Sequence, residues 1–126
     1  MIMNDIAIFG AGGFGREVAC LINRINEDKP IWNLIGFFDD NADLKGKMIS
    51  HFGPCLGGVD DLNRYDKPLN IVIAVGNPMA VKVIVDKIIN TLVEFPNIIH
   101  PNVKCADEKS FKIGKGNIVQ GGSFFS

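Results

Sequence analysis

The chain has 126 residues, of which 47% are hydrophobic and 21% are charged, and its formal net charge is −1 at pH 7. This balance is typical of one globular domain with a single core. The charge gives no electrostatic basis for binding nucleic acid or an anionic membrane. No apolar run approaches the ~18 residues of a membrane span. The amino end lacks the features of a signal peptide, so we expect a cytoplasmic protein.

The three cysteines, Cys20, Cys55 and Cys105, contain no close pair. Their spacing suits neither a disulfide framework nor a zinc site, and we expect no metal. Cys20 falls inside an apolar helical pattern and is predicted to be a small buried hydrophobe.

Short apolar runs that end at glycine or at acidic residues predict buried β-strands. They cover residues 6–9, 34–38 and 70–75, and a last edge strand is expected over 94–100. The glycine-punctuated segment 41–58 is predicted to be a loop.

Two segments carry apolar residues at i, i+3, i+4 and i+7, which is one face of a helix. The positions are Val18, Leu21, Ile22 and Ile25, and then Val81, Ile84, Val85 and Ile88. A short helix is also expected over 59–65. Strands and helices that alternate in this way predict an α/β fold, a small Rossmann-like parallel sheet with helices on its faces. Ligands of such folds bind at the carboxyl ends of the strands.

The first strand is followed by "GAGGFGRE", in which Gly10, Gly12 and Gly15 match the spacing G-x-G-x-x-G. Glycines at such a turn let a phosphate approach the backbone N–H groups at the start of a helix. The alternative is that they only make a tight turn between strand and helix. Arg16 is either a solvated residue of the first helical turn or a phosphate contact.

The next two strand ends also carry polar residues. Asp39, Asp40 and Asn41 follow the second strand, where dinucleotide-binding folds place an acid on a ribose hydroxyl. A solvated turn is the alternative. Gly76 and Asn77 follow the third strand, and Asn77 is also expected to cap the helix that begins at Pro78.

No catalytic residue is predicted. His51 and His100 are the only histidines, and neither has a sequence neighbour that suggests a triad. The carboxyl-terminal part has a different character, because Ile113, Val119 and Phe125 are six residues apart, as are Gly116 and Gly122. This period is typical of a hexapeptide β-helix, with glycine-rich coil as the alternative.

Six segments, in order, resemble the NeuD and PglD family of sugar acyltransferases, which includes sialic acid O-acetyltransferases. The segments are "IFGAGGFGREVA", "GFFDDN", "GGVDDL", "IAVGNP", "FPNIIHPNV" and "IGKGNIVQGG". The resemblance implies a Rossmann-like domain over 1–100. It also implies a junction and the first coil of a left-handed parallel β-helix over 101–126.

Members of that family are typically homotrimers that transfer acetyl from acetyl-CoA to a sugar hydroxyl or to the amino group of a nucleotide-linked sugar. The resemblance, together with the glycine motif and the polar strand ends, predicts a set of substrate-binding residues. These are Gly10, Gly12, Gly13, Phe14, Gly15, Arg16, Asp39, Asp40, Asn41, Gly76 and Asn77. Phe14 is a departure, because many members carry histidine there.

The resemblance also implies that the catalytic histidine and the acetyl-CoA site lie on later β-helix coils. We therefore expect a domain that binds a nucleotide-sugar or sugar, holds no cofactor of its own, and is inactive alone. Its parent would be an acetyl-CoA-dependent enzyme. An NAD(P)-binding oxidoreductase fragment and a nucleotide-sensing regulatory domain remain as alternatives. The identity of the sugar and the choice between O- and N-acetylation stay open.

Overall fold

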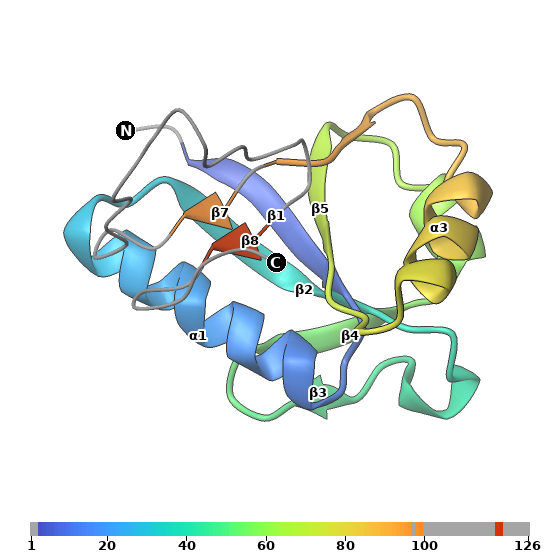
Figure 1. The fold of residues 1–126 in the computed structure, drawn as a ribbon, viewed down its shortest axis with the longest axis horizontal. Helices are drawn as coiled ribbons and strands as arrows, with labels where there is room; N and C mark the ends of the chain where they lie inside the picture. Colours follow the sequence, from blue (N-terminus) through green and yellow to red (C-terminus); the bar gives the residue numbers. More distant parts are fainter. Residues whose placement is uncertain (1–2, 97, 100–117, 120–126) are drawn as a thin grey trace.

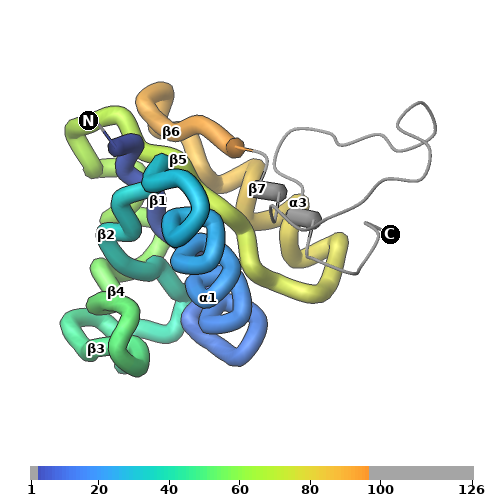
Figure 2. The backbone as a smooth tube through the Cα atoms, turned by 90° about the vertical axis from the view of Figure 1, so that its left-hand side faces the viewer, coloured from blue at the N-terminus to red at the C-terminus, as the bar shows by residue number. Residues whose placement is uncertain are grey.

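The computed structural model describes residues 3–96, 98–99 and 118–119. Its centre is a six-stranded sheet in the order β3-β4-β2-β1-β5-β6, which runs from bottom to top in Figure 2. The strands are β1 (Asn4–Phe9), β2 (Trp32–Phe38), β3 (Met48–Ile49), β4 (Gly53–Gly57), β5 (Leu69–Ile73) and β6 (Val93–Glu94). In a second, two-stranded sheet, β7 (Ile98–Ile99) pairs in parallel with β8 (Ile118–Val119).

The helices are α1 (Gly13–Asp28), α2 (Val59–Asn63) and α3 (Pro78–Lys87), with a 3₁₀ turn, η1, at Ala42–Leu44. Figure 1 shows α1 below β1 and β2, and α3 on the far side of β5. No helix within residues 3–96 is long and apolar enough to cross a bilayer.

The topology is that of one half of a Rossmann-like fold. β1 lies in the middle of the sheet and pairs in parallel with β2 on one side and with β5 on the other. β2 pairs in parallel with β4 further out, and β5 pairs in parallel with β6. The strand order therefore reverses between β1 and β5, which is where such folds bind ligands. The predicted α/β class and the Rossmann-like parallel sheet are confirmed.

Successive residues of β1 enter two different cores, as the alternation of side chains along a strand requires. Ile6 and Ile8 pack in a cluster with the buried stripe of α1. Ala7 and Phe9 pack in a second cluster, with Leu62 of α2 and Ile84 of α3. One face of the sheet is thus covered by α1 and the other by α2 and α3.

The prediction of a loop over 41–58 is wrong, because this segment contains β3 and β4 as an antiparallel hairpin whose second strand joins the sheet. Glycine and proline are depleted in strands, and "HFGPCLGG" therefore suggested a loop. Here the glycines allow two backbones to approach closely. A Cβ on Gly53 (φ +158°) would lie 3.3 Å from the Cα of Gly36 on the neighbouring strand.

Two other expectations need correction. The edge strand expected over 94–100 is replaced by two short strands, β6 and β7, that belong to different sheets. Cys20 is exposed, although it lies in α1. The apolar stripe of α1 runs through positions 18, 21, 22 and 25, and position 20 points away from that face.

Candidate functional site: the glycine loop at the switch point

The glycine loop, residues 10–15, joins β1 to α1 where the strand order reverses. The Gly10 N–H donates to the carbonyl oxygen of Phe38 at the end of β2 (2.7 Å). On the other side, the Ala74 N–H, just past β5, donates to the carbonyl oxygen of Phe9 (2.8 Å). The loop is therefore fixed between the ends of β2 and β5.

Two of its glycines are required by the fold itself. Gly10 has φ +117°, and a Cβ there would lie 2.6 Å from the carbonyl oxygen of Ala74. A Cβ on Gly15 would overlap the carbonyl group of Gly10. The first turn of α1 thus packs directly against the end of β1, and the tight-turn interpretation accounts for both residues.

The fold does not explain the other two glycines. A Cβ on Gly12 or Gly13 would meet no atom of the described chain within 4 Å, and neither residue has a positive φ. Gly12 is the N-cap of α1, and no side-chain hydrogen bond caps this helix in the described chain. Gly13 and Phe14, at the start of α1, are exposed, and no group of the described chain accepts their backbone N–H groups. Such free N–H groups at a helix start attract anions.

Asp39 fastens the glycine loop to the second strand end. One carboxylate oxygen, Oδ2, accepts the backbone N–H of Ala11 (2.8 Å), and Oδ1 accepts the N–H of Asn41 (2.9 Å). Both oxygens already have a protein partner. The bond from Ala11 to Asp39 joins residues 28 positions apart. It places the acidic pair Asp39–Asp40 beside the glycine loop.

The neighbours of Asp39 differ from it. Asp40 is exposed. Asn41 uses its side-chain oxygen to accept the N–H of Asp43 and so caps η1 (3.0 Å). Arg16 is exposed in the first turn of α1, and Phe14 is 37% exposed, an unusual position for a large aromatic ring.

The third strand end behaves as its sequence suggests. The side-chain oxygen of Asn77 accepts the N–H groups of Met79 (2.9 Å) and Ala80 (3.4 Å), which caps α3. Gly76 is exposed, and a Cβ there would meet nothing within 4 Å in the described structure. The contacts of Gly10 with Ala74 place this loop next to the glycine loop.

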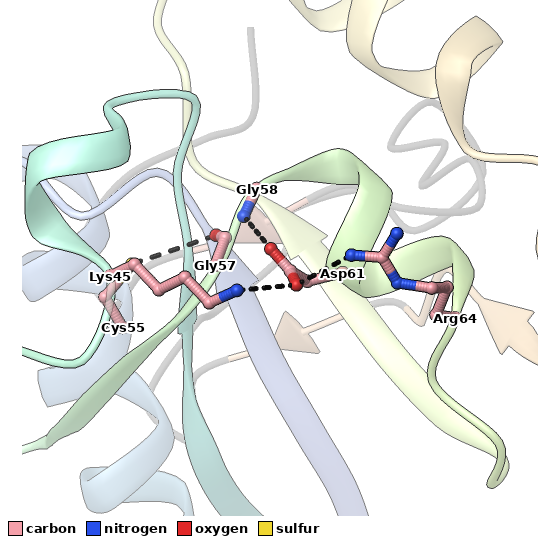
Figure 3. Close-up of polar contacts among 6 residues, drawn as sticks. All are labelled: Lys45, Cys55, Gly57, Gly58, Asp61 and Arg64. Carbon is pink, nitrogen blue, oxygen red and sulfur yellow. Dashed lines mark hydrogen bonds and ion pairs between the residues drawn. The ribbon is translucent and has the colours of Figure 1, made fainter.

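A fourth loop, the Gly57–Gly58 turn between β4 and α2, contains no predicted site residue and adjoins Asp39. The Asp39 N–H donates to the carbonyl oxygen of Gly57 (2.9 Å). The next residue, Gly58, donates its N–H to Oδ2 of Asp61 (3.0 Å), and Lys45 and Arg64 both contact Oδ1 (Figure 3). An acid three residues after a helix N-cap is the sequence signal that marks this arrangement.

The Lys45 ammonium, the Gly58 N–H and the Arg64 guanidinium together lower the pKa of Asp61 from 3.8 to about 2, with Lys45 contributing most. Each of these donors stabilises the ionised carboxylate more than the protonated acid. Asp61 is therefore a charged anchor at any physiological pH.

The site offers backbone N–H donors, an exposed acid and open space above two glycines, which suits binding more than bond cleavage. Within residues 3–96, no group of three His, Cys, Asp or Glu side chains could hold a metal ion. His51 is exposed on the β3–β4 hairpin, where its ring lies against Phe52 and Nδ1 is 3.2 Å from Ser50 Oγ. His100 and the six-residue repeat from Ile113 lie outside the described residues, except for Ile118 and Val119.

Comparison with known proteins gives one family. The sequence model of the family described as the PglD N-terminal domain matches residues 5–88 of this chain. These residues include all eleven predicted substrate-binding positions. No curated protein sequence matches the chain significantly.

Several solved structures are similar to this chain. One is the acetyltransferase domain of PglB from Neisseria gonorrhoeae FA1090 in complex with acetyl coenzyme A, with 26% identity and a TM-score of 0.72. The match covers 95% of this chain and 54% of that chain, so the present chain spans about half the length of that relative.

Two more distant matches show likeness of fold alone. PerB from Caulobacter crescentus, in complex with CoA and GDP-perosamine, is 19% identical with a TM-score of 0.64, and the match covers 96% of this chain and 53% of PerB. RSP, a Rex-family repressor, in complex with β-NADH is 18% identical with a TM-score of 0.55, over 94% of this chain and 53% of RSP.

Proposed function

The chain belongs to the family of PglD N-terminal domains, and from this premise we propose that it binds a nucleotide-sugar for an acetyl-CoA-dependent sugar acetyltransferase. The family resemblance drawn from the six sequence segments is confirmed by the family match and by the PglB structures. The PglB acetyltransferase domain binds acetyl coenzyme A, and PerB binds CoA and GDP-perosamine. The PglB structure supports acetyl-CoA as the donor of the parent enzyme, and the PerB structure supports a nucleotide-sugar as its acceptor.

One observation carries the proposal: no contact within the described residues 3–96 requires glycine at position 12 or 13. Gly10 and Gly15 are crowded by backbone atoms, whereas a Cβ at Gly12 or Gly13 would enter open space. Glycine here leaves the N–H groups of the first helical turn uncovered at the positive end of the α1 dipole. We assign this surface to the diphosphate of the substrate.

The two acids after β2 take different roles in this proposal. Asp39 has both oxygens committed to Ala11 and Asn41, so it positions the loop. Asp40 is exposed at the same strand end and is assigned to a hydroxyl or base edge of the nucleoside. Phe14, Arg16, Gly76 and Asn77 complete the proposed binding surface.

The proposal extends to the carboxyl-terminal part. Ile98 pairs in parallel with Ile118, twenty positions later, which is close to the ~18 residues of one coil built from three hexapeptides. This spacing supports residues 101–126 as a junction and first coil of a left-handed β-helix. Acetyl-CoA binding, catalysis and trimer formation are assigned to the β-helix of a cytoplasmic parent enzyme, and no catalytic step is assigned to these 126 residues.

The test is calorimetric titration of the chain with UDP, GDP, NAD and CoA. We expect UDP or GDP to bind, with weaker binding of NAD and none of CoA. Tighter binding of NAD would replace this proposal with the dinucleotide alternative. Binding of CoA to this chain alone would contradict the assignment of the acetyl-CoA site to the β-helix.

A matched pair of variants tests the role of Asp40. Asp40→Asn should weaken nucleotide binding about tenfold or more, since a hydrogen bond to a charged group contributes about 1.5–3 kcal/mol. Asp43→Asn removes the same charge from an exposed acid of η1 and should leave the affinity within about twofold, as surface charges contribute little. Equal losses in both variants would show a general charge effect and remove Asp40 from the site.

A further inference from the structure

We propose that Asp61, on α2, is a positioning residue for the glycine loop and acts on it through the Gly57–Gly58 turn and Asp39. This inference rests on the proposed function for its effect on nucleotide binding. Its structural part concerns the ligand-free protein and can be tested separately.

The first link joins Asp61 to the turn. Its Oδ2 accepts the Gly58 N–H (3.0 Å), while Oδ1 accepts from Lys45 Nζ (2.9 Å) and from the Arg64 guanidinium (3.1 Å). Lys45 comes from the segment between η1 and β3, and Arg64 from the end of α2. Figure 3 shows the carboxylate held between these two cations, directly beside the turn.

The second link is the fit of the turn to that carboxylate. Gly57 has φ +137°, and a Cβ at this position would collide with the carboxylate of Asp61 and lie 2.8 Å from its Cβ. The side chain of Asp61 therefore occupies the space that glycine leaves at position 57. Turn and carboxylate are packed as one unit.

The third link runs from the turn to the glycine loop. The carbonyl oxygen of Gly57 accepts the N–H of Asp39 (2.9 Å), and a Cβ on Gly58 would lie 3.5 Å from the Asp39 carbonyl oxygen. Asp39 Oδ2 in turn accepts the N–H of Ala11, inside the glycine loop (2.8 Å). An unbroken series of short contacts thus connects Asp61 with the loop assigned to the diphosphate.

A purely local role is the competing explanation. Asp61 is the third residue of α2 and caps its own helix through Gly58, which alone stabilises helix starts. Its partners Lys45 and Arg64 have side chains 58% and 72% exposed, and ion pairs so open to water contribute little. A local cap would change the stability of the protein and leave the Ala11 N–H unaffected.

The experiment measures amide hydrogen exchange by NMR in the ligand-free chain, for the wild type and Asp61→Asn. We expect the Ala11 amide to exchange about three- to tenfold faster in the variant, relative to the Ile8 amide in the core of β1, because one held hydrogen bond is loosened. The matched control is Asp60→Asn, which removes the same charge from the same helical turn. The Asp60 side chain is exposed and makes no hydrogen bond or ion pair within residues 3–96, and its backbone carbonyl, which accepts the Arg64 N–H, is unchanged by the substitution.

The second readout is the affinity for UDP or GDP, whichever the wild type binds more tightly. Asp61→Asn should weaken it about three- to tenfold, and Asp60→Asn should change it less than about twofold. Faster Ala11 exchange without any nucleotide binding by the wild type would support Asp61 as a positioning residue and reject the proposed function. Unchanged Ala11 exchange overturns the inference, whatever happens to melting temperature.

If Asp61→Asn does not fold, Asp61→Glu replaces it. Glutamate keeps the charge near Lys45 and Arg64 and displaces the oxygen that accepts from Gly58. The same faster exchange at Ala11 is expected, and its absence in a folded Asp61→Glu protein overturns the inference in the same way.

Discussion

The two junctions β1–α1 and β5–α3 are both strand-to-helix turns at the switch point, yet they satisfy their backbone groups differently. At β5–α3, the Asn77 side chain accepts the N–H groups of Met79 and Ala80, and Pro78 removes one donor altogether. At β1–α1, the N-cap is Gly12, and no side chain of the described structure caps the helix. The same kind of turn is closed by its own side chain in one case and left open in the other.

This difference separates the glycines and caps that the fold requires from the glycines that we assign to a ligand. A helix start that its own chain satisfies has little to offer an anion, whereas an uncapped start keeps its donors and its dipole available. The glycine loop is therefore the stronger candidate for the phosphate groups, and Asn77 is mainly a cap. Four changes test this comparison.

The largest effect is expected from Gly15→Ala. The added Cβ would overlap the Gly10 carbonyl group, so α1 must move away from β1. Overpacking of this kind costs about 1–3 kcal/mol and occasionally more. Urea denaturation should show a loss at or above the upper end of that range. A loss below about 0.5 kcal/mol would mean that the loop is looser than its contacts indicate.

Gly13→Ala, in contrast, should increase the stability of the protein. Gly13 is the first residue of α1, its Cβ would enter open space, and alanine at a compatible position stabilises by about 0.4–1 kcal/mol. The new methyl group would lie where the diphosphate is assigned, so nucleotide affinity should fall about tenfold or more. Calorimetry measures the expected loss of affinity, and thermal denaturation of the same sample measures the expected gain in stability. Unchanged affinity would remove the diphosphate from this surface.

Asn77→Ala should lower stability by about 1 kcal/mol through loss of the α3 cap. Asn77→Asp is the control, because its carboxylate accepts the same two N–H groups and should retain most of that stability. Affinity for the nucleotide should change less in either variant than in Gly13→Ala. A greater loss of affinity in Asn77→Asp than in Asn77→Ala would place the anion at α3 as well.

The smallest effect concerns a third junction, β4–α2, which Asp61 caps. Its pKa of about 2 lies below the ordinary 3.8, so the folded state favours the charged form. The resulting stabilisation is complete above pH 3.8 and is lost as the pH falls through about 2. The difference in unfolding free energy between wild type and Asp61→Asn should be constant above about pH 5 and shrink below pH 4. A difference that does not vary with pH would contradict the ion-pair anchor.

Much of the fold follows from local patterns. The strand cores at 6–9, 34–38 and 70–75 and the stripe of α1 were predicted because burial on one or both faces leaves a repeat that short windows reveal. The predicted burial of Cys20 was wrong, because position 20 lies off the face that the buried positions 18, 19, 21, 22 and 25 share. The hairpin in 41–58 was missed because glycine and proline weaken strand patterns.

The sequence alone determined that this chain is an α/β domain of the PglD N-terminal type, because apolar periods and a run of motifs are local properties. Only the tertiary structure decided which glycines are crowded by neighbouring backbone atoms, Gly10 and Gly15, and which face open space, Gly12 and Gly13. It also decided that Asp39 holds Ala11 and that Asp61 holds the turn beside Asp39. These roles depend on partners such as Ala11 and Asp39, 28 residues apart, or Lys45 and Asp61, 16 apart. Folding brings such partners together, and no short window of the sequence contains both.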